Sequence, residues 1–253
     1  MKQFLLKYIF SPIKPVLEWL LYCEAAVARA WVSNVHHRLL MVQWKITPHP
    51  EHFDHYIDLF YGWIKSRNSF GWERGVFGNL TLKGKNVLEL ACGDGFNARN
   101  FYSLRSERVV ACDFDPKAIK LAKSKNSAPN VEFVLSDIRY NMPQGTFENV
   151  IWDAAIEHFT LEETTQILNN IKARITPDGI LSGYTLVERK DGVKALSHHE
   201  YEFKSKQDLQ RILRPHFKNV IVFETVYTVR HNLYFWASDG PLPFTEGWDS
   251  WVH

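Results

Sequence analysis

The sequence predicts an α/β fold: a doubly wound, mostly parallel sheet of seven strands with an antiparallel last strand, preceded by an N-terminal helical extension. From Leu82 onward, short apolar runs typical of strands alternate with amphipathic helix patterns, as in a parallel sheet covered on both faces. Only a short turn separates the last two apolar runs, which indicates an antiparallel pair. We therefore expect a helical extension and lid over 1–80, a core over 81–238 and a tail over 239–253.

The first eighty residues show helical periodicity. After Pro15, which suits the first turn of a helix, apolar residues recur every three or four positions as far as Val35. A second helical stretch is expected over His52–Ser66. The segment Phe70–Gly78 holds three glycines and reads as a linker or lid, and its Trp72 is a candidate for contact with an acceptor molecule.

The expected core elements have recognisable ends. The strands are Asn86–Ala91, Arg108–Phe114, Val131–Leu135, Phe147–Trp152, Gly179–Thr185, Val220–Thr225 and Val229–Ala237. Three helix starts lie between them: Asp115 before a first-turn proline, a capping box over Thr160–Glu163, and a similar Ser205–Asp208 start. The sequence contains no internal repeat.

Composition and charge narrow the class of protein. The chain has 253 residues, 45% of them hydrophobic, and a formal net charge of +2. That charge does not point to nucleic acid as a partner, although residues 1–50 hold six Lys/Arg against two acidic residues. Three cysteines without CxxC spacing argue against a disulfide scaffold. No uncharged run reaches the length of a membrane span, so we expect a cytoplasmic protein.

The strongest signal is the segment Asn86–Ala98, in which an apolar strand runs into a small-residue turn and then a helix. Such a turn lets the backbone approach a ligand closely. Gly93, Gly95 and Ala98 also satisfy the loose dinucleotide-binding pattern. Glu89 distinguishes a dinucleotide site from a site for a cationic ligand. A carboxylate inside an apolar strand favours a cationic ligand and repels the pyrophosphate of a dinucleotide.

At this segment the sequence resembles the class I S-adenosylmethionine-dependent methyltransferases, whose glycine-rich motif appears here as Glu89-x-Ala91-x-Gly93-x-Gly95. The resemblance covers about residues 82–238. It continues through the ends of the second and third strands, through Trp152–His158, and through the turn before the fifth strand, Ile175–Gly179. Two positions depart from the family pattern: Glu148 stands for a usual Asp, and Asp178 for a glycine.

The resemblance implies a Rossmann-like fold and S-adenosylmethionine as methyl donor, with S-adenosylhomocysteine as product. In the family, an acid at the end of the second strand holds both ribose hydroxyls, and Asp113 matches it; Asp137 and Ile138 match the adenine site. We prefer a helix-cap role for Asp115. The donor-binding residues so implied are Glu89, Ala91, Cys92, Gly93, Asp94, Gly95, Asp113, Phe114, Asp137, Ile138 and Asp153.

Histidines at the same edge of the sheet are candidates for the chemistry. His158 follows the fourth strand and is the best-placed base for a hydroxyl acceptor, because imidazole titrates near neutrality; the alternative is a histidine that caps or packs. His198 and His199 follow the fifth strand and could line the acceptor pocket, supply the base, or bind a metal with His158 and Asp153. Adjacent residues of an extended segment point apart, so we expect no metal.

The acceptor is best described by what the sequence lacks. Family members that methylate nucleic-acid bases usually carry an Asn/Asp-Pro-Pro-aromatic segment after the fourth strand, whereas here Asp153–Ile156 has no proline. The resemblance favours a small acceptor, most plausibly an oxygen of a saccharide or polar metabolite. A lipid or quinone-like acceptor at a membrane surface, and a non-catalytic scaffold, are the alternatives.

Residues 1–45 allow two interpretations. Their positive charge and the seven aromatics of the first fifty residues suit an interfacial helix at a membrane surface. Glu18 and Glu24 weaken the cationic face, however. We therefore favour packing of the apolar stripe on the core or on a second copy in a homodimer.

Overall fold

The computed structural model describes residues 11–45, 69–227, 230–244 and 250–252. It divides into two units, residues 1–48 and 49–253, each of which is treated by itself. The expected helix over His52–Ser66 lies outside the described residues. No helix of the described part is both long and apolar enough to cross a membrane.

The first unit contains α2 (Ser11–Lys45). This helix begins before the expected start, so Pro12 occupies its first turn and Pro15 lies inside the helix. Proline is tolerated there because it removes only one backbone hydrogen bond near a helix end. Apolar side chains of α2, including Trp19, Leu21 and Trp31, are exposed.

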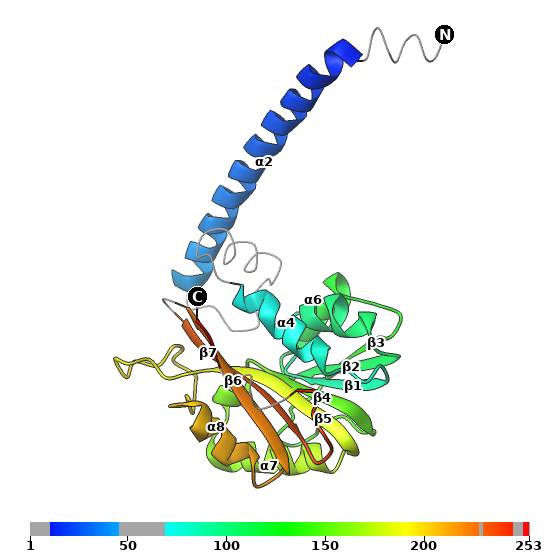
Figure 1. Cartoon of the computed structure of the whole chain (residues 1–253), viewed down its shortest axis with the longest axis vertical. Coiled ribbons are helices and arrows are strands. Elements are labelled where there is room, and N and C mark those ends of the chain that lie inside the picture. Colours follow the sequence, from blue (N-terminus) through cyan, green and yellow to red (C-terminus); the bar gives the residue numbers. More distant parts are fainter. Residues whose placement is uncertain (1–10, 46–68, 228–229, 245–249, 253) are drawn as a thin grey trace. The chain divides into compact units, whose positions relative to one another are not determined.

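The second unit is built on one sheet with strand order β3-β2-β1-β4-β5-β7-β6-β8 (Figure 1). Its strands are β1 (Asn86–Leu90), β2 (Arg108–Asp113), β3 (Val131–Leu135), β4 (Phe147–Asp153), β5 (Ile175–Leu186), β6 (Asn219–Tyr227), β7 (Arg230–Ser238) and β8 (Ser250–Val252). Strands β1 to β5 pair in parallel, and β7 runs antiparallel to both β5 and β6. The expected seven-stranded mixed sheet is confirmed.

Strand β8 was not expected. It lies in the segment interpreted as a tail and pairs in parallel with β6. A three-residue strand gives too short a pattern to recognise in a sequence.

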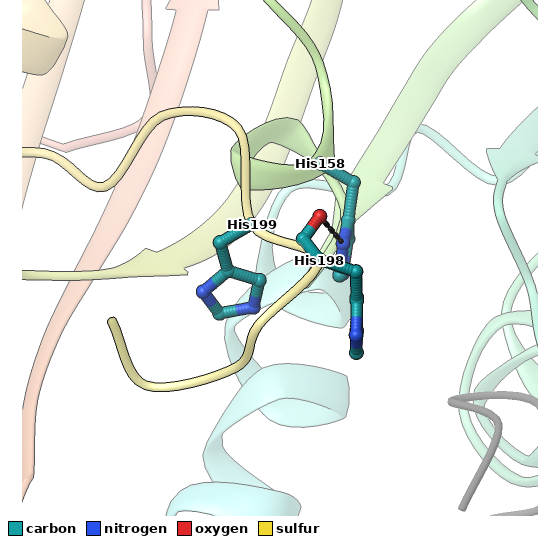
Figure 2. Close-up of side chains that lie close together, drawn as sticks. All are labelled: His158, His198 and His199. Atoms are coloured by element: carbon teal, nitrogen blue, oxygen red, sulfur yellow. Dashed lines mark hydrogen bonds between the residues drawn. The ribbon is translucent and has the colours of Figure 1, made fainter. Parts of the chain in front are cut away.

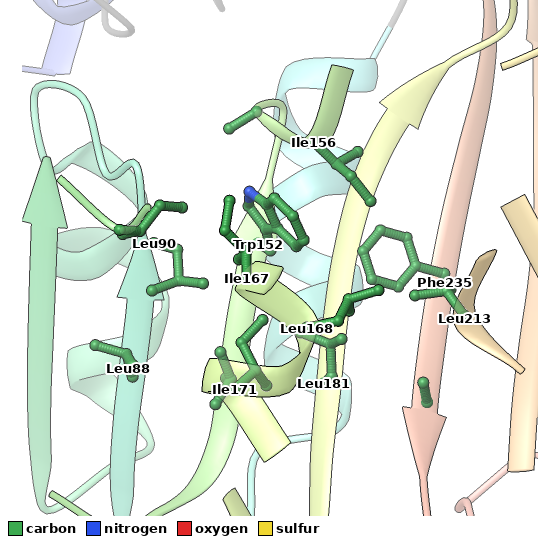
Figure 3. Close-up of a cluster of buried hydrophobic side chains, with 14 of the residues drawn as sticks. Leu88, Leu90, Trp152, Ile156, Ile167, Leu168, Ile171, Leu181, Leu213 and Phe235 are labelled. Atoms are coloured by element: carbon green, nitrogen blue, oxygen red, sulfur yellow. The ribbon is translucent and has the colours of Figure 1, made fainter. Parts of the chain in front are cut away.

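Helices cover both faces of the sheet. One face packs against α7 (Leu161–Lys172) and α8 (Lys206–Leu213), with Leu88, Leu90 and Trp152 at the centre of its core (Figure 3). The other face packs against α5 (Phe96–Asn100), α6 (Pro116–Lys125) and α4 (Phe70–Leu80). Side chains alternate between faces along a strand, so Glu89 shares the face of Val87, on the side of α5 and α6.

The expected helix starts form as predicted. Asp115 caps α6 by accepting from the Lys117 N–H, and Thr160 forms a reciprocal capping box with Glu163 at the start of α7. The Ser205 hydroxyl caps α8 by accepting from the Asp208 N–H.

The glycine-rich segment predicted to be a linker or lid is instead the helix α4. Its glycines permit close packing rather than hinge motion: a Cβ on Gly75 would lie 2.3 Å from the Phe101 ring. The buried Glu73 carboxylate accepts hydrogen bonds from Thr225 (3.0 Å), Tyr227 and Tyr234 (2.9 Å). These bonds hold α4 against β6 and β7, which places the next residue, Arg74, over the sheet.

Candidate active site

The candidate site lies where the chain reverses direction across the sheet. From β1 the chain proceeds outward to β2 and β3, then returns to β4 on the other side of β1. Ligands of open α/β sheets bind at this switch point, beyond the carboxyl ends of the strands. Ala91 and Ala154 follow β1 and β4 directly, and both have left-handed backbones, with φ of 54° and 53°. Such conformations are costly for alanine and cluster at functional sites.

The loop after β1 is held by the carboxylate at the end of β2. Asp113 accepts from the Gly93 N–H through Oδ2 and from the Asp115 N–H through Oδ1, both at 2.9 Å. A carboxylate has about four acceptor sites, so Asp113 can hold the loop and also accept hydrogen bonds from a ligand. Gly95 (φ 73°) turns the chain into α5, where a Cβ would lie 2.5 Å from the Phe133 ring. Asp113 therefore ends β2 beside the glycine loop, and its ribose-binding role stays a prediction.

The loop residues Cys92 and Asp94 are buried. The Cys92 N–H donates to the Cys112 carbonyl (2.9 Å), which ties the loop to β2. Burial, followed by the nearby Glu89, raises the pKa of the Cys92 thiol, which disfavours its thiolate form. Asp94 accepts from the Phe96 N–H at the start of α5 (3.1 Å).

A buried charge cluster lies below this loop. Glu89 is 2% exposed, and its Oε2 has no hydrogen-bond partner among the described residues. Burial and then the Asp153 carboxylate raise the pKa of Glu89 well above its usual range, while Arg74 opposes the shift. Arg74 contacts Asp153 through both Nε (2.7 Å) and Nη2 (2.6 Å), and the Asn97 amide donates to the same oxygen (3.2 Å). The cluster holds two carboxyl groups and one guanidinium, so it suits a ligand that carries a positively charged group of its own.

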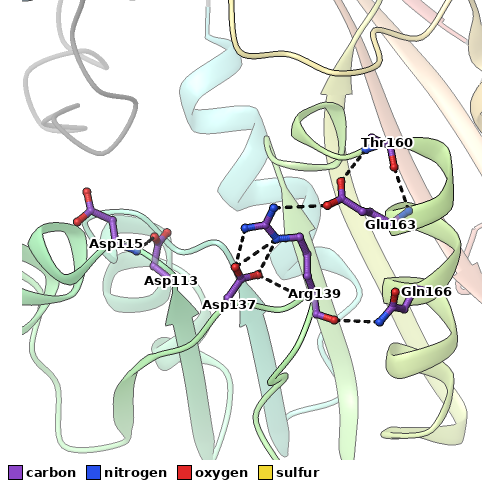
Figure 4. Close-up of polar contacts among 7 residues, drawn as sticks. All are labelled: Asp113, Asp115, Asp137, Arg139, Thr160, Glu163 and Gln166. Atoms are coloured by element: carbon purple, nitrogen blue, oxygen red, sulfur yellow. Dashed lines mark hydrogen bonds and ion pairs between the residues drawn. The ribbon is translucent and has the colours of Figure 1, made fainter.

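The predicted adenine-site residues follow β3. Ile138 is buried, whereas Asp137 is partly exposed and paired with Arg139, whose Nη2 lies 2.7 Å from Oδ2 (Figure 4). This guanidinium lowers the pKa of Asp137. Arg139 also reaches Glu163 of the α7 capping box at 3.4 Å, which fixes the turn after β3 against α7.

Two predicted ligand-contact residues carry exposed aromatic rings. Phe114, immediately after β2, is 55% exposed. Trp72, on α4, is 39% exposed, and its ring packs edge-on against Phe96 at 6.3 Å between centroids. Both rings are accessible to a bound molecule.

Three histidines converge beyond β4 and β5 (Figure 2). His158 ends the short helix η4 (Ile156–His158), and its ring stacks on that of His198 at 4.9 Å and 8°. The His199 ring meets the His158 ring edge-on at 4.8 Å. We call these three residues the histidine cluster. The structure therefore brings together the predicted catalytic residue and both predicted acceptor-pocket histidines.

The expectation that His198 and His199 point apart is wrong, because the segment turns instead of running extended. The His199 N–H closes the turn on the Leu196 carbonyl at 3.2 Å. The Glu157 carbonyl then accepts from the N–H groups of Glu200 (2.8 Å) and Tyr201 (3.1 Å), which ties the turn to η4.

A buried carboxylate orients the innermost histidine. Glu202 Oε1 accepts from the Ala195 N–H (2.7 Å) and lies 2.5 Å from His199 Nδ1. Burial lowers the pKa of His199, which favours its neutral imidazole. Glu157 is also buried, and burial raises the pKa of its carboxyl group.

Sequence reasoning missed the roles of Arg74 and Glu202. Arg74 lies within the segment predicted to be a lid, where nothing in the sequence indicates which acid it would meet. Glu202 was visible as an acid three residues after His199, a spacing that is common in turns of any function.

The sheet order, the acid-held glycine loop at the switch point and the carboxylates at the ends of β1 and β2 define a class I S-adenosylmethionine-dependent methyltransferase domain. The comparisons with known proteins agree. Residues 87–179 match a family described as "Methyltransferase domain". Enzymes of this class use S-adenosylmethionine as methyl donor.

Curated relatives match over part of their length. Ribosomal protein L11 methyltransferase of Vibrio parahaemolyticus is 29% identical over 104 residues, 41% of this chain and 34% of that relative. Malonyl-[acyl-carrier protein] O-methyltransferase of Bacillus anthracis is 24% identical over 159 residues, 57% of this chain and 58% of that relative. The chain thus spans about a third to three fifths of these proteins.

Solved structures share the fold. The DhpI complex with S-adenosylhomocysteine has a TM-score of 0.54 and 20% identity, over 72% of this chain and 90% of that one. N-methyltransferase NodS from Bradyrhizobium japonicum, also bound to S-adenosylhomocysteine, has a TM-score of 0.53 and 16% identity. The match covers 74% of this chain and 99% of the NodS chain.

Proposed function

We propose that this protein transfers a methyl group from S-adenosylmethionine to an oxygen of a small polar acceptor, such as a saccharide. The observation that carries the proposal is the pairing of two sites at one edge of the sheet. Carboxylates lie at or next to the ends of β1, β2 and β4 on one side, and the histidine cluster follows β4 and β5 on the other. The first set suits a cationic donor, and the second suits a hydroxyl acceptor.

The donor carries an ammonium and a sulfonium, so it complements an acidic site. Glu89 contributes a buried carboxylate oxygen that lacks a partner among the described residues, and such an oxygen gains most from a bound cation. Asp113 would accept the ribose hydroxyls while it holds the glycine loop. Asp137, Ile138 and Phe114 would contact the adenine side, and Asp153 would contribute beside Arg74.

The acceptor would lie against the histidine cluster, with Trp72 as a further contact. Methyl transfer from a sulfonium needs the acceptor in line with the breaking C–S bond, and a hydroxyl must also lose its proton. We propose His158 as the catalytic residue, contacting the reacting oxygen and promoting loss of that proton. Among the relatives, the name malonyl-[acyl-carrier protein] O-methyltransferase also describes transfer to oxygen, which supports this acceptor atom.

Donor binding tests the first half of the proposal. Calorimetry with S-adenosylmethionine should show binding to the full chain, and Asp113→Ala should weaken it by about 1.5–3 kcal/mol, as expected for hydrogen bonds to a charged group. The control is Asp115→Asn, two residues away, which keeps the α6 cap and should bind normally. Absence of donor binding to the native chain would reject the proposed function.

Transfer of a labelled methyl group tests the acceptor class. The protein and labelled donor are incubated with three fractions of a bacterial lysate: small polar metabolites, lipids and proteins. We expect label in the polar-metabolite fraction. Label confined to protein would contradict the proposed acceptor class and would place the activity beside that named for the ribosomal-protein relatives. Donor binding with no label in any fraction would favour a non-catalytic scaffold.

One observation favours a second candidate, methylation of a lipid-like acceptor at a membrane surface. Helix α2 exposes Trp19 and Leu21 at 63% and Trp31 at 68%, as an interfacial helix would. The prediction that residues 1–45 pack on the core or on a second copy opposes it. Removing residues 1–45 separates the two. Aggregation or a melting temperature several degrees lower would support packing, whereas unchanged melting with lost binding to anionic liposomes would support the membrane.

A further inference from the structure

The histidine cluster has the composition of a metal site. His158, His198 and His199 each offer one ring nitrogen, and these nitrogens all lie within 4.8 Å of one another. They come from two segments forty residues apart, and Figure 2 shows the rings gathered between η4 and the turn after β5. Imidazole is the preferred ligand of zinc and of several other divalent first-row metals.

The geometry requires only a small adjustment to bind a metal. With Zn–N bonds of about 2.0–2.1 Å, nitrogens of a tetrahedral site lie about 3.3 Å apart. Nitrogens within 4.8 Å would therefore move together by on the order of 1 Å, a change that rotation about side-chain bonds can supply. The His158 and His198 rings are accessible enough for such rotation, while His199, 1% exposed, would act as the fixed ligand.

Glu202 gives the fixed ligand its orientation. A metal-binding histidine usually directs its second ring nitrogen at a carboxylate, which fixes the ring and strengthens it as a ligand. Glu202 Oε1 lies 2.5 Å from His199 Nδ1 and is itself held by the Ala195 N–H. This leaves His199 Nε2 as the ligating atom.

We propose that His158, His198 and His199 bind one divalent cation of the zinc type, with Glu202 positioning His199. Three protein ligands leave a fourth position open, as in catalytic zinc sites, and an acceptor oxygen would occupy it. The identity of that oxygen rests on the proposed function, but the metal site itself does not.

With the cation bound, His158 contacts the metal instead of the reacting oxygen, and it promotes proton loss through the cation. A divalent cation lowers the pKa of a bound hydroxyl, whose proton then passes to solvent water. The oxygen lone pair forms the new bond to the methyl carbon. The C–S bond breaks with its electrons going to sulfur, so the sulfonium becomes the neutral thioether of S-adenosylhomocysteine. Neither the cation nor the protein changes oxidation state.

Titration of the chelator-treated full chain with Zn²⁺ tests the site. The chain has eleven histidines, some outside the described residues, so the diagnostic quantity is the loss of one equivalent rather than the total bound. We expect His158→Ala and His198→Ala each to lose one equivalent, and the double variant to lose no more than either, because ligands of one ion act as a unit. His216→Ala, beyond α8, should bind as the native chain does.

Two further measurements complete the test. Glu202→Gln keeps a hydrogen-bond acceptor and should weaken Zn²⁺ binding about 10–100-fold, the usual effect of altering such a partner. The visible spectrum of the Co²⁺-loaded chain should report four-coordination, and the single variants should lose it. Losses that add independently, or no lost equivalent in either variant, would overturn the metal site. Donor affinity, measured alongside without metal, reports on the proposed function separately.

Discussion

The two sides of the switch point are built in different ways. On the donor side, the carboxylates Glu89, Asp113 and Asp153 lie at or next to the ends of their own strands. Backbone amides of Gly93 and Asp115 hold Asp113, at 2.9 Å each. On the acceptor side, His158 and His199 are forty-one residues apart in the sequence, and a turn tied to the Glu157 carbonyl brings them together. The strand ends thus fix the positions of the donor-side carboxylates, whereas a turn between loops brings the acceptor-side histidines together.

This difference affects how freely the residues on each side of the site can be substituted. A donor site that is fixed by strand ends and a glycine loop is tied to the sheet itself. The histidine cluster sits on η4 and a loop, where substitutions leave the sheet intact. Loops on a rigid scaffold commonly carry the specificity of a fold used for many substrates. Variants on each side should therefore change different measured quantities.

The largest expected effect is on the acceptor side. His158→Ala should lower kcat for methyl transfer about 10²–10⁴-fold, the usual contribution of a group that assists proton removal. Donor affinity should stay within about twofold, because His158 is not among the donor-binding residues. Steady-state kinetics and calorimetry with S-adenosylmethionine measure the two quantities, with His216→Ala as the control. Equal losses in both would show that the two sides are not separate.

The next effect tests how strongly α4, which carries Arg74, is held to the donor side. Arg74→Ala leaves Asp153 buried, 5% exposed, without its ion-pair partner. Breaking a buried pair in this way typically costs about 3–5 kcal/mol of unfolding free energy. Arg108→Ala removes a guanidinium from Glu132 at the surface, where both side chains are about half exposed, and should cost at most about 1 kcal/mol. Urea unfolding of both variants measures the two losses, and equal losses would show that the Arg74–Asp153 pair does not hold α4 to β4.

The sequence predicted the sheet and the starts of its helices well, for a physical reason, while the donor-binding roles of the strand-end residues stay predictions. Strands of apolar residues, Asp115 before Pro116 and the Thr160 capping box are local signals, and each forms as predicted. The errors came where tertiary contacts decide. The glycines of Phe70–Gly78 predicted a linker or lid. In the structure, Gly75 and Gly78 instead allow α4 to pack closely against Phe101 and Tyr102. The turn at His198 depends on the Glu157 carbonyl, which no local pattern indicates.

A third prediction concerns the cost of keeping an acid buried for a cationic ligand. Glu89→Gln should weaken donor binding by about 1.5–3 kcal/mol, since the amide loses its attraction for the ammonium. The same change should stabilise the ligand-free protein near neutral pH, because burial raises the pKa of Glu89. The two effects have opposite signs, which a purely structural role would not produce.

The pH dependence of this effect has a definite sign. The pKa of Glu89 is higher in the folded chain than in the unfolded one, so the folded state binds more protons. The free energy of unfolding therefore falls as the pH rises above the unfolded value, and the Gln variant should gain most at the higher pH. Thermal melts of both proteins from pH 4 to pH 8 measure it. A constant difference across that range would contradict the assignment.

The smallest effect compares the two sides at matched positions. Ala91 follows β1 on the donor side, Ala154 follows β4, and both have φ near +54°. A left-handed backbone costs an alanine about 1–2 kcal/mol, part of which Gly recovers while it adds flexibility to the unfolded chain. We expect Ala91→Gly and Ala154→Gly each to change the unfolding free energy by less than about 1 kcal/mol, in the stabilising direction. If strain at Ala91 also shapes the glycine loop for the donor, only Ala91→Gly should alter donor affinity. Loss of donor affinity in Ala154→Gly alone would place the sensitive backbone on β4 instead.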